Sequence, residues 1–148
     1  FFFTSGFAFG EGRGEILQDI ENRLSSQFVI AMPNDISLGT REVYDECVPN
    51  ESSSIDPSQL IESYLGDYTF SVNDLQPAAF RVEPRMKGIY SQLLKIGFDH
   101  VVLTGSGSAF VCYGMVDSPK LAGVTLYNVS MLKRERELWY EAPAKVLT

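Results

Sequence analysis

Glycine and serine alternate in one loop of the sequence, formed by Gly105, Ser106, Gly107 and Ser108. Apolar runs flank this Gly/Ser loop at 101–103 and 109–113, so the backbone must turn between two buried segments. Such a loop can turn several N–H groups toward one point, and its hydroxyls add donors, which suits a phosphate group or a neighbouring phosphate loop. A plain turn between core strands is the commoner meaning of a Gly/Ser pattern, and the loop alone favours that interpretation.

A tyrosine is the second residue that could bind a ligand. The apolar run 28–32 ends at Pro33 and predicts a buried strand, after which Thr40 stands where a helix N-cap would. Val43 and Tyr44 would share one face of the helix that follows. The ring of Tyr44 can pack in the core or stack on a nucleobase at a pocket rim. The helical pattern alone favours the core.

Composition and charge limit the classes of partner. The chain has 148 residues, 45% of them hydrophobic, which is enough for one domain or slightly more with a real core. Its net charge of −7 argues against nucleic acid or an anionic membrane surface as the main partner, because both need a basic footprint. An anionic small molecule is not excluded, since backbone N–H groups can hold a phosphate. No apolar run approaches the length of a membrane span.

The two cysteines, Cys47 and Cys112, lie far apart, each within an apolar pattern. This spacing indicates neither a disulfide framework nor a metal knuckle. Buried free thiols in a reducing compartment are therefore expected, and no metal site is expected in this chain.

The elements that must position these residues are predicted from the rest of the pattern. Asn73 and Asp74 precede an apolar helical stretch and are typical of a helix cap, where their side chains satisfy the first backbone N–H groups. Pro84 opens the strongest helical pattern of the chain, and Gly97 supplies its stop. Gly88 lies inside that helix at a cost of about 1 kcal/mol against alanine, which indicates close packing there.

The order of the predicted elements indicates the fold class. Residues 7–17 predict a β-hairpin with two glycines at its bend and Arg13 between them. A strand, several helices and three further strands follow. This order favours an α+β sandwich, with helices on one face of a mostly antiparallel sheet, and a ferredoxin-like arrangement is the first choice. The fold class alone decides nothing about activity.

Three stretches together resemble a known family. They are Phe-Phe-Phe-Thr-Ser-Gly at 1–6 with Gly-Arg-Gly-Glu at 12–15, Pro33 with Thr-Arg-Glu-Val-Tyr at 40–44, and Asn-Asp-Leu-Gln at 73–76 with Leu-Thr-Gly-Ser-Gly-Ser at 103–108. In this order they resemble the GHMP (galactokinase, homoserine, mevalonate, phosphomevalonate) kinase superfamily, which shares the last motif. The first two stretches resemble its branch that phosphorylates 4-diphosphocytidyl-2-C-methyl-D-erythritol in non-mevalonate isoprenoid biosynthesis.

The resemblance implies that residues 1–26 end a ribosomal S5-like kinase domain and that residues 27–148 form the GHMP kinase C-terminal domain, a ferredoxin-like sandwich. It implies transfer of a phosphoryl group from ATP, with Mg²⁺ on the phosphates, to the 2-hydroxyl of the substrate. In the family an aspartate acts as base and a lysine supports it. Both would lie before Phe1, so we expect missing upstream residues, an N-terminal kinase domain as partner, and no activity of this chain alone.

The resemblance also implies roles for residues of this chain. The backbone at Arg13 would meet the cytosine edge of the substrate, and Tyr44 would stack on the cytosine ring with Thr40 nearby. The Gly/Ser loop at 105–108 would support the ATP phosphate loop across the domain interface. The implied compartment is a bacterial cytoplasm or the plastid stroma.

Two alternatives stay open beside this interpretation. The chain can belong to another GHMP kinase that acts on a different alcohol. It can also be a non-catalytic α+β module that binds a small ligand or contacts another subunit, with a Gly/Ser turn that binds nothing. Binding of cytidine nucleotides separates these possibilities.

Overall fold

The computed structural model describes residues 8–19, 27–48 and 72–130, together with positions 56, 59, 61 and 62. The chain divides into two compact units, one over residues 26–130 and one that contains the N-terminal hairpin. The opening motif at 1–6 lies outside the described residues. The assignment of 1–26 and 27–148 to two domains of a kinase stays a prediction.

The hairpin consists of strands β1 (Ala8–Glu11) and β2 (Ile16–Asp19), which pair antiparallel with Ala8 opposite Asp19 and Glu11 opposite Ile16. Arg13 lies in the turn between them, and its side chain is exposed. Its backbone N–H donates a hydrogen bond to the carboxylate of Glu15. The predicted hairpin is therefore confirmed.

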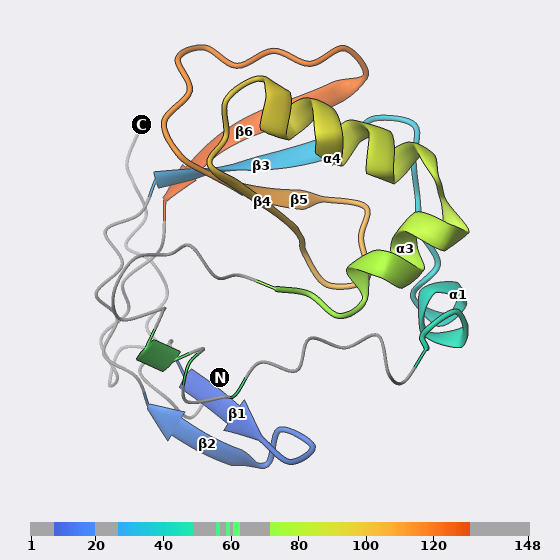
Figure 1. Cartoon of the computed structure of the whole chain (residues 1–148), viewed down its shortest axis with the longest axis vertical. Helices are drawn as coiled ribbons and strands as arrows, with labels where there is room; N and C mark the ends of the chain where they lie inside the picture. The colour runs from blue at the N-terminus through green and yellow to red at the C-terminus, as the bar shows by residue number, and fades with distance from the viewer. Residues whose placement is uncertain are drawn as a thin grey trace, which may run out of the picture. The chain divides into compact units, whose positions relative to one another are not determined.

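The unit over residues 26–130 is built on a four-stranded antiparallel sheet of order β4-β5-β3-β6 (Figure 1). Its strands are β3 (Gln27–Pro33), β4 (His100–Leu103), β5 (Phe110–Tyr113) and β6 (Val124–Ser130). The run 28–32 is the buried strand that the sequence predicts, and Pro33 ends it. Strand β3 pairs with β5 on one side and β6 on the other, and its side chains alternate between the core and the outer face.

The helices that the structure describes from end to end are α1 (Thr40–Asp45), α3 (Gln76–Val82) and α4 (Arg85–Lys95). Helix α4 crosses one face of the sheet, and α3 and α1 follow at one end of the strands (Figure 1). The core gathers buried side chains of the helices and the sheet: Val29, Ala31, Val43, Ala78, Ala79, Met86, Leu93, Val101, Leu103, Phe110 and Cys112. The α+β prediction with an antiparallel sheet is confirmed. The ferredoxin-like arrangement stays a prediction, since residues 114–123 connect β5 to β6 without a helix.

Both cysteines are free. Cys112 lies fully buried in β5, and burial raises the pKa of its thiol to about 12, so it stays protonated at neutral pH. Cys47 is half-buried, and its Sγ donates to the carbonyl of Val43 at 3.4 Å. Within the described part of the chain, none of the helices has the length and apolar character needed to span a bilayer.

Gly88, in the middle of α4, has open space around it, so the close packing that the sequence indicates is wrong. A Cβ built at Gly88 meets no atom within 4 Å. Replacing Gly88 with alanine is therefore expected to raise the free energy of unfolding by about 1 kcal/mol, because only the helix propensity changes. Urea denaturation measures this difference.

A glycine at the end of the same helix is the control for Gly88→Ala. Gly97 follows α4 with a φ of 112°, a left-handed value that costs an L-residue about 1–2 kcal/mol. Gly97→Ala is expected to lower the free energy of unfolding. A loss of stability in Gly88→Ala would show that α4 tolerates no side chain at either position.

Candidate functional site

The Gly/Ser loop joins β4 to β5 as a closed turn. The N–H of Thr104 donates to the carbonyl of Ala109 at 2.9 Å, and the N–H of Gly107 donates to the carbonyl of Thr104 at 3.1 Å. Gly107 has a φ of 100°, and a Cβ there would lie 2.6 Å from Cδ1 of Leu38. The left-handed backbone conformation requires glycine at this position, and a Cβ would also displace the end of the Leu38 side chain.

Both serine hydroxyls of the loop contact the segment between β3 and α1. The Oγ of Ser106 lies 3.0 Å from Oγ1 of Thr40, the first residue of α1. The hydroxyl of Ser108 donates to the carbonyl of Ile36 at 2.9 Å. The loop therefore holds a segment that lies 66 to 72 residues earlier in the chain.

The loop keeps backbone donors for other partners. No described residue accepts a hydrogen bond from the N–H groups of Gly105, Ser106 or Ser108. Gly105 is exposed, and the two serines are half-buried. Backbone N–H groups in a glycine-rich turn are the donors that bind phosphates or brace a phosphate-binding loop.

Helix α1 places Thr40 and Tyr44 four residues apart, on neighbouring positions of one face. The helix begins at Thr40, with Gly39 as the N-cap and no side-chain cap, so the predicted capping role of Thr40 is wrong. Its hydroxyl contacts Ser106 instead. The core interpretation of Tyr44 is also wrong, because its side chain is 60% exposed while Val43 beside it is fully buried. The ring of Tyr44 is thus accessible for stacking.

A guanidinium from α3 holds the other end of α1. Nη2 of Arg81 donates to the carbonyl of Glu46 at 2.7 Å, at the C-cap of the helix. A positive charge at a helix C-terminus interacts favourably with the helix dipole. A helix of six residues cannot persist by itself, so this contact and the burial of Val43 determine where Tyr44 lies.

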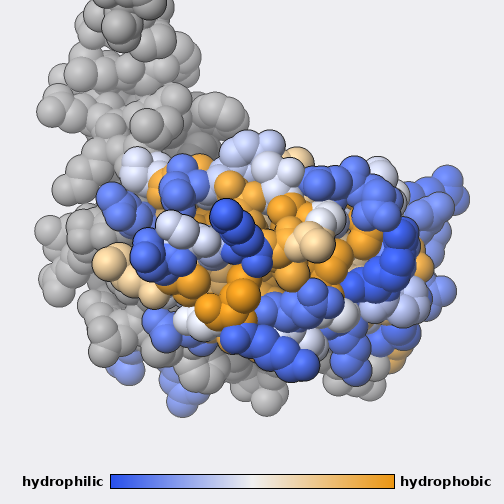
Figure 2. Space-filling view, turned by 90° about the horizontal axis from the view of Figure 1, so that it is seen from above, coloured by the Kyte–Doolittle hydropathy of each residue, from blue (hydrophilic) through white to orange (hydrophobic). Residues whose placement is uncertain are grey.

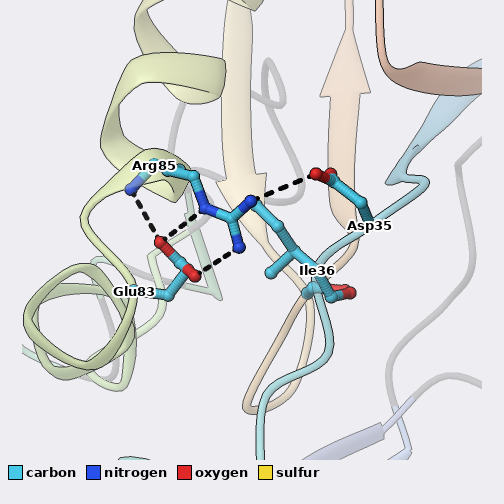
Figure 3. Close-up of polar contacts among 5 residues, drawn as sticks. Asp35, Ile36, Glu83 and Arg85 are labelled. Carbon is cyan, nitrogen blue, oxygen red and sulfur yellow. Dashed lines mark hydrogen bonds and ion pairs between the residues drawn. The ribbon is translucent and has the colours of Figure 1, made fainter.

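An ionic cluster at the start of α4 holds the segment before α1. Arg85 lies between two carboxylates, 2.7 Å from Glu83 and 3.1 Å from Asp35 (Figure 3). The pKa of Glu83 is lowered, mainly because the side chain of Arg85 donates to it, so both groups are charged at neutral pH. Asp35 precedes Ile36, whose carbonyl accepts from Ser108. The cluster therefore anchors the segment that the loop contacts.

Two amide side chains that the sequence did not single out for the site also contact the Gly/Ser loop or its entry. Nδ2 of Asn73 donates to the carbonyls of Leu103 at 2.6 Å and Gly105 at 2.7 Å. Oε1 of Gln76 accepts from the N–H of Leu103 at 2.8 Å. The predicted capping role of Asn73 is wrong, because Leu75 is the N-cap of α3 and no side chain caps it. Oδ1 of Asn73 accepts from the N–H of Leu75 at 3.0 Å, in the turn before the helix. The sequence signal for a role of these two residues in the site was their place in the Asn-Asp-Leu-Gln stretch at 73–76, which is part of the family resemblance.

The structure brings Thr40 into contact with the Gly/Ser loop, whereas Arg13 belongs to a different unit of the chain. Thr40 meets the Gly/Ser loop, and Tyr44 lies on the same helix as Thr40. Arg13 belongs to the hairpin, in the other unit. Among the described residues, no group of three or more histidine, cysteine, aspartate or glutamate side chains could hold a metal ion.

Relatives of known name match almost the whole chain. It is 33% identical to "4-diphosphocytidyl-2-C-methyl-D-erythritol kinase, chloroplastic" of Arabidopsis thaliana, over 97% of this chain and 41% of that protein. It is 32% identical to "4-diphosphocytidyl-2-C-methyl-D-erythritol kinase" of Protochlamydia amoebophila, over 99% of this chain and 48% of that protein. The chain thus spans less than half the length of these relatives. No family model matches it.

A solved structure has a similar fold. The crystal structure of a 4-(cytidine 5'-diphospho)-2C-methyl-D-erythritol kinase superposes with a TM-score of 0.57 at 24% sequence identity. The superposition covers 74% of this chain and 41% of the solved chain. At this identity the likeness supports the α+β fold, and the sequence matches support the relationship.

Proposed function

The chain is homologous over nearly its whole length to the C-terminal part of 4-diphosphocytidyl-2-C-methyl-D-erythritol kinases, and from this premise we propose that it forms the substrate-binding part of such an enzyme. The full-length enzyme would transfer a phosphoryl group from ATP to the 2-hydroxyl of 4-diphosphocytidyl-2-C-methyl-D-erythritol. This chain would contribute binding surfaces and no catalytic residue. The aspartate base and its lysine would belong to an N-terminal kinase domain.

One observation carries this proposal. The hydroxyls of Thr40 and Ser106 lie 3.0 Å apart, although the two residues were assigned to different halves of the reaction. Thr40 begins the helix proposed to bind the nucleoside, and Ser106 belongs to the loop proposed to brace the phosphates. A kinase must hold both reactants within a few ångströms of each other, since proximity and orientation supply much of its rate.

Each group has a role that its surroundings allow. Tyr44, exposed on α1, would stack on the cytosine ring, and Thr40 would lie beside it. The backbone of Arg13 would contact the cytosine edge, a role that rests on the family resemblance of the Gly-Arg-Gly-Glu stretch at 12–15. The N–H groups of the loop at 105–108 would support the ATP phosphate loop of the kinase domain.

Magnesium and the partner domain follow from the same proposal. ATP-dependent kinases use Mg²⁺ to neutralise the phosphates. The described residues offer no cluster of metal ligands, so we assign Mg²⁺ to the N-terminal kinase domain.

Figure 2 shows a band of hydrophobic residues on the surface of the unit, bordered by hydrophilic ones. An exposed apolar band of this kind is suited to contact with a partner domain.

The names of the relatives bear on the compartment. The Arabidopsis protein is named chloroplastic, and the Protochlamydia protein is bacterial. We propose the plastid stroma or a bacterial cytoplasm as the place where this chain acts.

Removing the ring of Tyr44 tests the proposed nucleobase site. Cytidine diphosphate is expected to protect the full-length protein from thermal unfolding, and Tyr44→Ala is expected to weaken that binding by about 1–3 kcal/mol if the ring stacks. Tyr44→Phe keeps the ring and should keep the protection. Tyr127→Ala is the matched control, because Tyr127 is exposed to a similar degree, at 49%, on β6.

The outcomes separate the possible functions. Unchanged protection in Tyr44→Ala would remove this residue from the site. Protection by ATP without protection by cytidine nucleotides would identify a GHMP kinase with a different substrate. A protein that responds to neither nucleotide would be a non-catalytic module.

A further inference from the structure

Strand β4 ends against side chains instead of a neighbouring strand. Among the described strands β4 pairs only with β5, so Leu103 lies at an edge of the sheet. Its carbonyl accepts from Asn73 and its N–H donates to Gln76. The two amides therefore reproduce the hydrogen bonds of a strand at the residue where β4 runs into the Gly/Ser loop.

Asn73 reaches further, into the loop itself. Its second Nδ2 hydrogen bond goes to the carbonyl of Gly105, which has a φ of 58°. With Oδ1 bonded to the N–H of Leu75, both donors and the acceptor of this amide are used. The partners also fix the orientation of the amide, since only its nitrogen can face two carbonyl oxygens. The side chain is half-buried, where a lost partner costs more than on the surface.

We propose that Asn73 is a positioning residue that sets the backbone of the Gly/Ser loop for its role toward the phosphates of ATP, a proposal that rests on the proposed function. A loop that works through backbone N–H groups must present them in one arrangement before the ligand arrives. Asn73 fixes the carbonyls on both sides of Thr104, at Leu103 and Gly105. The N–H of Ser106 belongs to the same peptide group as the carbonyl of Gly105, and the N–H of Gly105 belongs to the peptide group before it.

Two isosteric changes from amide to acid separate this role from the turn that Asn73 forms before α3. Asn73→Asp keeps the oxygen that accepts from the N–H of Leu75 but places a carboxylate against two carbonyl oxygens. A residue that only formed this turn would tolerate the change, because aspartate and asparagine side chains both bond the backbone two residues on. Gln76→Glu is the matched control, since the contact to Leu103 uses only the oxygen of Gln76. Both variants add one negative charge close to the same helix start.

Steady-state kinetics of the full-length enzyme is the first measurement. Asn73→Asp is expected to raise the KM for ATP about 10-fold and to leave the KM for the cytidine substrate within about twofold. Gln76→Glu is expected to leave both within about twofold. An Asn73→Asp enzyme with an unchanged KM for ATP overturns the proposal. Equal increases of both KM values also overturn it, because a general loss of structure would produce them.

A second measurement does not depend on activity. The backbone amide NMR signals of Gly105 and Ser106 are expected to move in Asn73→Asp and to stay in place in Gln76→Glu. If the unaltered enzyme phosphorylates nothing, the proposed function fails and the role toward ATP fails with it. The amide signals then still decide whether Asn73 holds the loop, and unmoved signals overturn that part as well.

Discussion

Replacing Phe110 with alanine is expected to lower the free energy of unfolding by about 3–5 kcal/mol, because its side chain is the largest fully buried one among the described residues. The ring lies 6.4 Å from that of Phe80 and 6.2 Å from that of Tyr90, and these two rings lie 5.7 Å apart. The three rings join β5 to both helices α3 and α4. Urea denaturation followed by circular dichroism measures the loss.

Phe28→Ala is the matched control for this prediction. Phe28 is half-buried on β3, where its ring has Tyr113 as a neighbour at 6.1 Å. Partial burial makes the same chemical change cost about 1–2 kcal/mol. Equal losses in the two variants would contradict a core centred on Phe110.

Gly114→Ala is expected to lower the free energy of unfolding by about 3 kcal/mol or more, since backbone strain and steric overlap add. Gly114 follows β5 with a φ of 105°. A Cβ there would lie 2.5 Å from Oδ2 and 2.8 Å from the backbone nitrogen of Asp99. Asp99 cannot move away freely, because its N–H donates to the carbonyl of Tyr113 at 3.0 Å. Thermal and urea denaturation both report this loss.

Gly123 is the control for the steric part of that loss. It has a φ of 75°, but a Cβ there meets no atom within 4 Å. Gly123→Ala should therefore cost only the left-handed conformation, about 1–2 kcal/mol. A Gly114→Ala protein as stable as Gly123→Ala would show that the start of β4 shifts to accept the methyl group.

The strands could be predicted from the sequence because their signals are local. The run 28–32 needs only its own apolar residues and the stop at Pro33 to be recognised, and 101–103 is bounded in the same way by the glycines that follow. The hairpin around Arg13 also carries its turn residues within itself. These local signals do not show which strands pair. The sequence therefore predicted a mostly antiparallel sheet but not the strand order β4-β5-β3-β6.

The site residues were harder to predict because their partners lie far away in the sequence. Thr40 is a good cap by type, but its hydroxyl contacts a serine 66 residues later. Asn73 was predicted as a cap, but Leu75 is the N-cap of α3, and the amide of Asn73 bonds carbonyls 30 and 32 residues away. Tyr44 shares its helical pattern with Val43, yet so short a helix buries only one narrow face. In each case the tertiary contact decides the role, and no local pattern contains it.

The side-chain hydrogen bonds at Leu103 also bear on self-association. An edge strand offers unpaired N–H and C=O groups to a strand of another molecule, and this is how many sheets begin to aggregate. At Leu103 both groups are already bonded within the same molecule, to Asn73 and Gln76. This end of β4 therefore offers no unpaired backbone group at Leu103, and the two amides disfavour pairing with a strand of another molecule there.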